Sequence, residues 1–319
     1  MTPRFDLVGL GLIATDHIVS LPRFPGPGEK IRYDSERTLP GGQVAGAVVV
    51  ATRYGLTASF CGSVGEDEEG DLQIAELARE GVDASRLRRV PCTHSQRAWI
   101  FVEEASGERT IFYDRPPALT LPAGEVDASW IASGRVLHLD GHDAHAAAHA
   151  AELARAAAVP VSVDLANLYE HQRHHTLRLL RSTDYLIASE NFARQLFGSL
   201  APEPALARLR AEFGIAFAAL TLGADGVLAL ADSALLPQGR VYVPGFEVDV
   251  TDTTGAGDVL HGGFLVGLLR GWPLAEALEF GAALAALNCT AHGARGHIAA
   301  AAEVAALRHS ARRRARATL

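Results

Sequence analysis

Short apolar strands alternate with alanine- and leucine-rich stretches along most of this 319-residue chain, and this pattern constrains its fold most strongly. Runs typical of strands are FDLVGLGL, TASFCGSVG, RVLHLDGHD, VPVSVDLA, DYLIAS and FAALTLG, and segments such as DLQIAELAREG and AHAAAHAAELARAAA separate them. The alternation predicts parallel strands whose connecting helices cover both faces of a sheet. We therefore predict a three-layer α/β/α fold with a mainly parallel central sheet, in which ligands bind at the carboxyl ends of the strands.

Two segments, residues 12–39 and 92–116, break this alternation. They contain alternating, β-branched and aromatic residues, and the second has a hairpin-like ASGER turn between WIFVEE and TIFY. We predict that they form a small antiparallel β-sheet, called the lid below, which projects from a main α/β domain made of residues 1–11, 40–91 and 117–319. A lid of this kind can close over a substrate and exclude water.

The bulk composition excludes several classes of partner. The formal net charge of −8 disfavours nonspecific binding to nucleic acid. No apolar run reaches the length of about 18 residues that a membrane span requires. The sequence MTPRFDLVGLGL lacks the basic segment and small-residue cleavage site of an export signal. We expect a cytoplasmic protein with neither a membrane nor a nucleic acid as partner.

Two nucleotide-binding motifs can be set aside. Lys30 is the only lysine in the chain and no GxxxxGK[ST] sequence occurs, which excludes a P-loop. GLGLIA at residues 9–14 matches a GxGxxA dinucleotide fingerprint, and an NAD-dependent oxidoreductase would need a helix directly after it. Prolines follow instead, at positions 22, 25 and 27, and proline lacks the amide that a helix interior uses. We predict that no helix forms there.

The stretch TDTTGAGDVLHGGF at residues 251–264 follows a strand-like run and opens a segment with helical spacing of apolar residues. A glycine-rich turn at the start of a helix gathers unpaired N–H groups and forms an anion site. The amides of residues 255–257 are predicted to hold a phosphoryl group during its transfer. Asp258 lies in the first turn, where its carboxylate can accept a proton from a substrate hydroxyl.

DTTGAGD at residues 252–258 resembles the C-terminal signature of the ribokinase-like (PfkB-type) carbohydrate kinases. PGGQVAGA at residues 40–47 is similar to the earlier signature of that family, and TLGADG at residues 221–226 to its nucleotide-binding strand end. The resemblance covers nearly the whole chain. It implies a ribokinase-like fold and the ATP-dependent phosphorylation of a hydroxyl on a pentose, a ketohexose or a modified sugar. It also implies Mg²⁺ as a cofactor and leaves open the use of a monovalent cation (K⁺).

The resemblance assigns a role to individual residues. Asp258 is the general base, and Gly255, Ala256 and Gly257 form the anion hole. The residues implied to bind the substrate are Asp16, Gly41, Gly42, Gln43, Asp140 and Asp258. The residues implied to bind the nucleotide are Ser189, Glu190, Thr221, Gly223, Gly226, Thr253, Gly255, Gly257 and Asn288, and those implied to serve the metal are Asp252 and, through water, Glu190.

The chain departs from the family pattern at two places. Many members carry asparagine where Gly46 stands, and the contact of that side chain with the sugar cannot be made here. The NxxE motif, which is tied to Mg²⁺ and phosphate, falls on residues 189–192 (SENF), so its first Asn and its final Glu are absent. Glu190 is the carboxylate that remains in this segment.

Three charged residues outside the signatures have two interpretations each. Asp164 ends a strand, where it either faces the site from its floor or caps a loop. Arg109 and Arg115 lie on or beside the lid hairpin. They either make up a charged, solvated lid face or contact an anionic substrate or nucleotide.

Two other functions share these features. A nucleoside kinase would use the same fold and base, and a catalytically silent sugar-binding regulatory module would account for the departures at Gly46 and Phe192. We also expect a homodimer formed through the lids, because a β edge that carries WIF and TIFY would be prone to aggregation if left bare.

Overall fold

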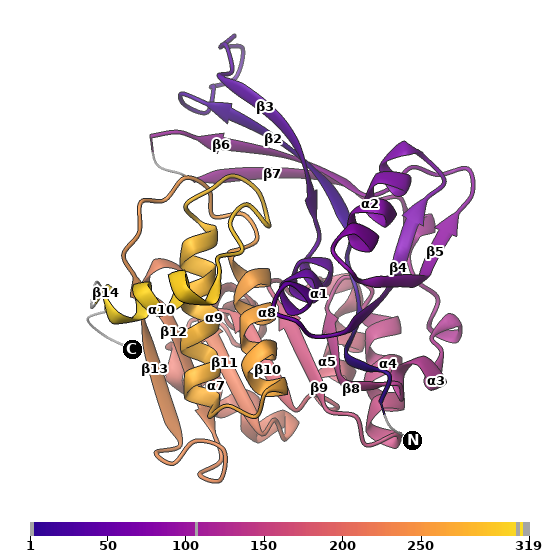
Figure 1. Ribbon diagram of the computed structural model, residues 1–319, viewed down its shortest axis with the longest axis vertical. Helices are drawn as coiled ribbons and strands as arrows, with labels where there is room; N and C mark the ends of the chain where they lie inside the picture. The colour runs from indigo at the N-terminus through magenta and orange to yellow at the C-terminus, as the bar shows by residue number, and fades with distance from the viewer. Residues whose placement is uncertain (1–2, 106–107, 311–312, 315–319) are drawn as a thin grey trace.

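The computed structural model describes residues 3–105, 108–310 and 313–314. These residues contain a large twisted sheet of ten strands (Figure 1). In spatial order the strands are β14 (Arg313–Arg314), β13 (Arg240–Phe246), β12 (Gly226–Ala231), β11 (Phe217–Thr221), β10 (Tyr185–Ser189), β9 (Val161–Leu165), β8 (Gly134–Asp140), β1 (Phe5–Leu10), β4 (Ala58–Gly65) and β5 (Asp83–Val90). The strands from β11 to β5 pair in parallel, and β12, β13 and β14 continue the sheet in antiparallel pairs. The predicted mainly parallel sheet is confirmed.

Helices cover both faces of this sheet. One face is covered by α3 (Ala128–Ile131), α4 (Ala144–Ala156), α5 (Arg173–Leu180), α6 (Glu190–Phe197) and α7 (Pro202–Phe213). The other is covered by α1 (Gln43–Arg53), α2 (Glu68–Arg79), α8 (Ala256–Leu269), α9 (Leu274–Asn288) and α10 (Ala301–His309). Short 3-10 helices lie at Pro117–Leu119, Ala123–Glu125, Glu170–Gln172 and Gly223–Asp225. These elements give the three predicted layers.

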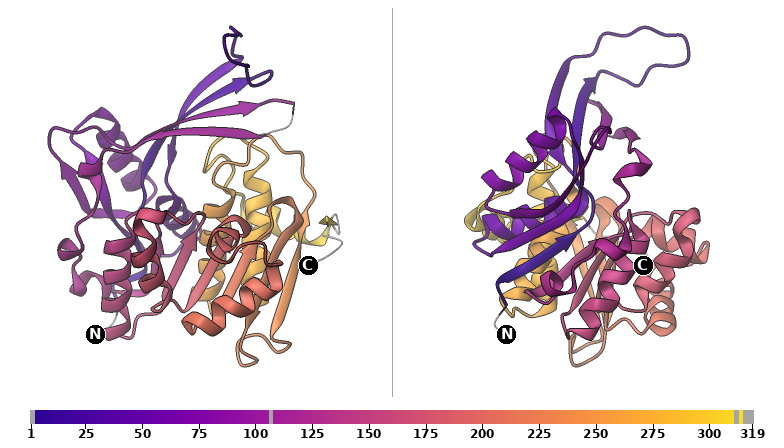
Figure 2. Two further views of the ribbon diagram at one scale, coloured as in Figure 1. Left: turned by 180° about the vertical axis from the view of Figure 1, so that it is seen from behind. Right: turned by 90° about the vertical axis from the view of Figure 1, so that its right-hand side faces the viewer.

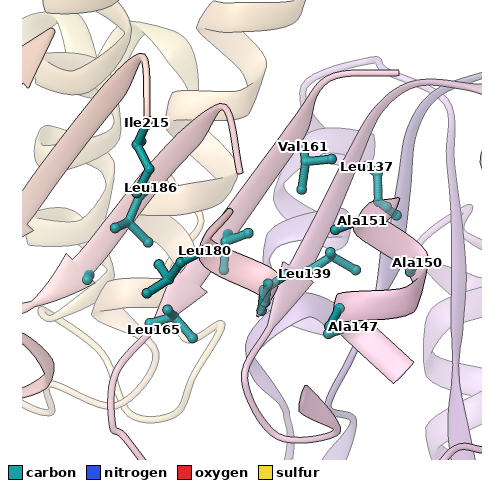
Figure 3. Close-up of a cluster of buried hydrophobic side chains, with 14 of the residues drawn as sticks. Leu137, Leu139, Ala147, Ala150, Ala151, Val161, Leu165, Leu180, Leu186 and Ile215 are labelled. Carbon is teal, nitrogen blue, oxygen red and sulfur yellow. The ribbon is translucent and has the colours of Figure 1, made fainter. Parts of the chain in front are cut away.

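Alanines allow α4 to pack closely on the sheet. Leu137 and Leu139 of β8 lie beside Ala147 and Ala151 of α4 in the core shown in Figure 3, and all four are at most 1% exposed. Burial of one leucine side chain contributes about 1.5–3 kcal/mol. The alanine-rich pattern that predicted a helix here therefore also sets how near that helix lies to β8.

The lid is a second sheet that rises above the main body (Figures 1 and 2). Its strands are ordered β3 (Ser35–Gly41), β2 (Ala14–Leu21), β6 (Arg97–Glu103) and β7 (Arg109–Asp114). The outer pairs are antiparallel, as predicted, whereas the central pair of β2 and β6 is parallel. The lid consists of two antiparallel pairs, β2 with β3 and β6 with β7. The first strand of each pair, β2 or β6, leads away from the main domain, so these two strands run side by side in the same direction.

The structure tests what the sequence predicted for the start and the limits of the lid. β2 follows β1 directly, so the prediction that no helix follows GLGLIA is confirmed. β3 continues to Gly41, two residues past the predicted limit of 39. Residues 106–107 of the predicted ASGER turn lie outside the described residues. Among the described residues, no helix is long and apolar enough to cross a membrane.

Candidate active site

The glycine-rich corner leads from β13 into α8, which begins at Ala256 with Gly255 as its N-cap. Gly255 has φ 71°, in the left-handed region, and a Cβ atom there would lie 2.2 Å from the Ala294 carbonyl oxygen. Only glycine fits this position without distortion. The Ala256 amide donates to Thr253 at 3.3 Å, and Gly257 is exposed at the start of the helix. The corner thus lies at the amino end of α8, as the sequence predicted, and the binding of an anion there stays a prediction.

Asp258 lies in the first turn of α8 and is partly exposed. Burial, followed by repulsion from Asp164, raises the pKa of Asp258 to about 7, while His261, Arg295 and Arg109 oppose the rise. A carboxylate with this pKa both takes and releases a proton near neutral pH, which is the property that a general base needs.

Gly46 of α1 lies directly against Asp258. A Cβ atom at position 46 would be 2.9 Å from Asp258 Cβ and 3.5 Å from its Oδ2. Any larger side chain there would move the carboxylate. The departure from the family pattern at Gly46 is therefore matched to the position of Asp258.

Asp16 of β2 lies on the lid and is 6% exposed. It lies against Gly41, where a Cβ atom would be 2.3 Å from Asp16 Oδ2. Burial, followed by the charge of Asp258, raises the pKa of Asp16 to about 7, and Arg295 opposes the rise. The carboxylates of Asp16 and Asp258 therefore lie close enough for the charge of one to affect the other.

Arg295, which the sequence patterns did not single out, supplies a buried positive charge near both carboxylates. Its Nη2 donates to the Gly41 carbonyl at 3.0 Å, whereas its Nε and Nη1 have no hydrogen-bond partner among the described residues. Burial lowers the pKa of Arg295 to about 10, and the charges of Asp16 and Asp258 oppose that change. The one sequence feature that could have indicated Arg295 is its position between small residues, in the segment GARG.

The second glycine signature places the start of α1 beside β9. Gly42 is the N-cap of α1 with φ 101°, and Gln43 Nε2 donates to Asp164 Oδ2 at 3.2 Å. Asp164 is 5% exposed at the end of β9. Of the two interpretations of Asp164, this contact supports the one in which the residue faces the site.

Asp140, at the end of β8, joins the start of the lid to the main sheet. Its Oδ2 accepts from the Leu12 amide at 2.6 Å, and its Oδ1 accepts from the His142 amide at 2.9 Å. Burial alone would raise the pKa of Asp140, but the contacts with His142 and Leu12 hold it below the ordinary value. One oxygen thus fixes backbone where β1 leads toward β2, and the other fixes the turn after β8. Contact of Asp140 with substrate stays a prediction.

The two lid arginines differ in their contacts. Arg109 of β7 donates through Nη1 to Thr253 Oγ1, so the lid touches the glycine-rich corner directly. Arg115 Nη2 lies 2.7 Å from Asp143 Oδ2 in a largely buried ion pair. The contact of Arg109 supports a lid that reaches the nucleotide, whereas Arg115 anchors the chain after β7 to the start of α4.

The predicted nucleotide side consists mainly of backbone turns and helix caps. Ser189 is the N-cap of α6; its hydroxyl accepts from the Phe192 amide at 2.9 Å and donates to the Ala166 carbonyl at 2.6 Å. Thr221 ends β11. Gly223 and Gly226, which follow, have φ 61° and 103°, and a Cβ atom on Gly226 would lie 2.1 Å from the Val243 carbonyl oxygen.

Asp252 and Asn288 hold the phosphate corner in shape. Asp252 Oδ1 accepts from the Thr254 amide at 2.8 Å, and its Oδ2 accepts from the Gly293 amide at 2.8 Å. Asn288 Nδ2 donates to the carbonyls of Thr254 and Ala294, both at 3.3 Å. Both side chains are 0% exposed. Asn288, which the resemblance implies to bind the nucleotide, contacts this loop instead and has no exposed surface.

The side chains present fit a Mg²⁺ ion that is bound mainly by phosphate oxygens and water. In the part of the chain that the structure describes, no group of three or more His, Cys, Asp or Glu residues could hold a metal. The oxygens of Asp252 already accept from N–H groups, so this residue does not fit as a direct ligand. Glu190, partly exposed in the first turn of α6, fits a contact through water.

Comparisons with known proteins agree on one family. The model of the pfkB family carbohydrate kinases matches residues 5–300. The chain is 29% identical to a ribokinase of Haemophilus influenzae over 92% of its own length and 95% of the relative's. It is 26% identical to a nucleoside kinase of Methanothermobacter thermautotrophicus, over 93% and 94% of the two chains. The crystal structure of a Thermotoga maritima ribokinase superposes with a TM-score of 0.78 at 26% identity, over 95% of this chain and 99% of that one.

Proposed function

The chain belongs to the pfkB family of carbohydrate kinases, and from this we propose that it transfers the γ-phosphoryl group of ATP to a hydroxyl of a monosaccharide-like substrate. It is a phosphotransferase with an alcohol group as acceptor. The observation that supports the proposal best is the position of Asp258, in the first turn of α8 beside the anion-binding corner and with its pKa raised to about 7.

In the proposed reaction the sugar lies between the lid and α1. Asp16 accepts hydrogen bonds from sugar hydroxyls, and Gln43 is held in place by Asp164 so that its oxygen faces the pocket. The reacting hydroxyl approaches Asp258, which removes its proton as the oxygen attacks the γ-phosphorus, while the bond from that phosphorus to the bridging β-phosphate oxygen breaks and ADP leaves. The amides at residues 255–257 stabilise the negative charge that redistributes over the phosphoryl oxygens.

The nucleotide lies on the side of β10, β11 and β12, according to this proposal. Backbone at Thr221, Gly223 and Gly226 shapes its binding surface, and Arg109 of the lid lies close enough to Thr253 to reach the phosphates. Mg²⁺, when bound, neutralises phosphate charge, and Glu190 would contact it through water. Dependence on K⁺ rests on the family resemblance alone, and assays in potassium and tetramethylammonium salts test it.

The lid, residues 12–39 and 92–116, is proposed to close over the sugar and to pair with the lid of a second copy. Its edge strand β7 exposes Ile111, Phe112 and Tyr113 by 46%, 54% and 63%. Bare apolar edges favour association. Light scattering at micromolar concentration is expected to give a dimer mass, and a monomer would refute the pairing.

We assign the reaction to the cytoplasm, where ATP is regenerated.

A nucleoside is the second candidate acceptor, because one relative of similar identity is a nucleoside kinase. A screen of monosaccharides and nucleosides, with Mg²⁺ and a non-hydrolysable ATP analogue, separates the two by the rise in Tm. We expect stabilisation by a sugar, and stabilisation by nucleosides alone would refute the sugar assignment. ATP consumption with the same panel tests the silent regulatory alternative, which predicts none.

A further inference from the structure

His261 has no part in the proposed reaction, although it lies one turn after Asp258 on α8 and is 2% exposed. Its Nδ1 lies 2.8 Å from the Gly257 carbonyl oxygen, and its Nε2 lies 3.1 Å from the Ile187 carbonyl oxygen. The same Nδ1 is 3.6 Å from Asp164 Oδ2. The ring thus connects the helix of the catalytic base with the ends of β9 and β10.

The partners of His261 decide how many protons its ring carries. A carbonyl oxygen can only accept, so each ring nitrogen must donate to make both contacts. A neutral imidazole has one N–H and one lone pair, and the lone pair would then point at a carbonyl oxygen. The contacts therefore fit the imidazolium form, which is a positive charge in a closed interior and requires a nearby anion.

Asp164 is that anion. Its carboxylate is 5% exposed and accepts from Gln43 on the pocket side. Burial raises the pKa of Asp164, and the charge of His261 is the largest effect that opposes the rise. His261 likewise opposes the rise at Asp258, where Asp164 is the largest repelling charge. One cation thus lies beside two carboxylates that repel each other.

The neighbouring histidine differs from His261. His138 of β8 has its ring centroid 5.5 Å from that of His261, and its Nδ1 lies 3.2 Å from Ser162 Oγ. Burial, followed by the charge of His261, lowers the pKa of His138 to about 3, so this ring is neutral. The remaining titratable groups that face the two carboxylates are Asp140 and His142 at the end of β8, Arg295 after α9, Arg109 of β7 and Asp16 of β2.

We propose that His261 is a buried imidazolium that keeps Asp164 and Asp258 ionised together, and thereby sets the pH below which the enzyme loses activity. It is a positioning residue, because it touches Asp164 and the backbone rather than the reacting atoms. Through Asp164 it also keeps the Gln43 amide oriented toward the acceptor. The inference about catalysis rests on the proposed function, whereas the charge of the ring does not.

The charge is tested first on the unaltered protein. With ¹⁵N-histidine labelling, long-range NMR correlation reports whether one or both ring nitrogens carry a proton, and the spectrum of His261→Gln assigns the signal. We expect both nitrogens of His261 to be protonated at about pH 7.5, which is above the ordinary histidine pKa of about 6.5. A neutral tautomer would overturn the proposal, and this measurement requires no enzymatic activity.

Kinetics then test the consequence. In the parent protein kcat/KM falls as the pH is lowered, and we call this part of the profile the acidic limb. For His261→Gln we expect the acidic limb to move up by about one pH unit, because the positive charge beside two carboxylates is removed. At a given pH on that limb, kcat/KM should then be about tenfold lower. The KM for the sugar should rise more than the KM for ATP. His138→Gln, which alters a neutral buried ring, should leave the limb in place.

A double variant separates charge from structure. If His261 acts by compensating Asp164, the limb should move back toward its original position in His261→Gln/Asp164→Asn, because the repelling charge is also gone. A double variant whose limb stays as high as that of the single variant would contradict the proposal, as would an unshifted single variant. If His261→Gln does not fold, His261→Asn takes its place both in the assignment of the NMR signal and in the kinetics. A protein that phosphorylates no sugar would instead refute the proposed function.

Discussion

The proposed acceptor side of the site, around Asp16 and Asp258, and its proposed donor side, at the ends of β10 and β11, differ in the residues that form them. Titratable groups lie around α8, β2 and β9: Asp16, Asp164, His261 and Arg295 are buried, and Asp258 is partly exposed. The ends of β10 and β11 offer a serine cap and glycine turns instead. The acceptor side must tune one carboxylate for proton transfer, whereas the donor side needs a shape that fits phosphates and a base. Charge substitutions should therefore affect turnover on one side, and backbone changes should affect binding on the other.

The largest effect is expected at the base. Asp258→Asn removes proton acceptance and should lower kcat by about 10²–10⁴-fold with the fold intact. Asp71→Asn, at an exposed position of α2 paired with Arg89, is the control and should keep normal turnover. Steady-state assays and circular dichroism of both variants test this. Near-normal turnover of Asp258→Asn would show that the two sides do not differ as described.

The phosphate corner, where the two sides meet, should respond to backbone changes. Gly255→Ala would place a Cβ atom 2.2 Å from a carbonyl oxygen at φ 71°, so we expect a lower Tm and a loss of kcat/KM of about 10²-fold. At Gly257 an added Cβ meets no heavy atom within 4 Å. Thermal melts of Gly257→Ala should therefore match those of the parent protein. Equal destabilisation by both substitutions would contradict the close approach at Gly255.

The third prediction concerns the pH dependence of kcat/KM, which Asp258 on the acceptor side should set. Because the pKa of Asp258 is raised to about 7, kcat/KM should fall about tenfold for each pH unit below that value. The raised pKa of Asp258 has the opposite effect on the free energy of unfolding, which should fall as the pH rises. A raised carboxyl pKa favours the folded state below the ordinary value of about 4, and this contribution is lost as the pH rises toward 7. Asp258→Asn should thus melt no lower than the parent protein at about pH 8. An acidic limb near pH 4 would refute the assignment.

The smallest effect is expected on the donor side. Ser189→Ala removes the N-cap of α6 and should lower stability by about 1 kcal/mol, raise the KM for ATP a few-fold and leave the KM for the sugar unchanged. Asp127→Ala removes the cap of α3, which directly precedes the amino end of β8. That variant should lose stability without a change in either KM. If Ser189→Ala raised the KM for the sugar but not the KM for ATP, the assignment of Ser189 to the donor side would be wrong.

Local signals made much of the fold and the anion corner predictable. The period of apolar residues indicated the strands and helices, and DTTGAGD carries glycine, helix start and carboxylate within one short segment. The contact of Gly46 with Asp258 and the approach of Arg295 to Asp16 depend on segments that are distant in the chain. No local pattern encodes such contacts, and none encodes the parallel pairing of β2 with β6.

Residues that the resemblance placed at the nucleotide show the same limit. Asn288 has a helical position consistent with contact to a base, but a buried amide must satisfy its hydrogen bonds, and carbonyls of the phosphate loop are its partners. Asp252 likewise binds backbone amides. His261 stood in the quoted signature stretch, yet its two carbonyl contacts become visible only when β10 lies against α8.

The most direct test follows labelled phosphate. The purified protein is incubated with γ-³²P-ATP, Mg²⁺ and a panel of monosaccharides and nucleosides, and the labelled products are separated and identified by mass spectrometry. We predict a labelled sugar monophosphate from the parent protein, and a rate of label transfer with Asp258→Asn that is lower by about 10²-fold or more. Label found only on nucleosides, or equal labelling of a sugar by both proteins, would contradict a sugar kinase that uses Asp258 as its base.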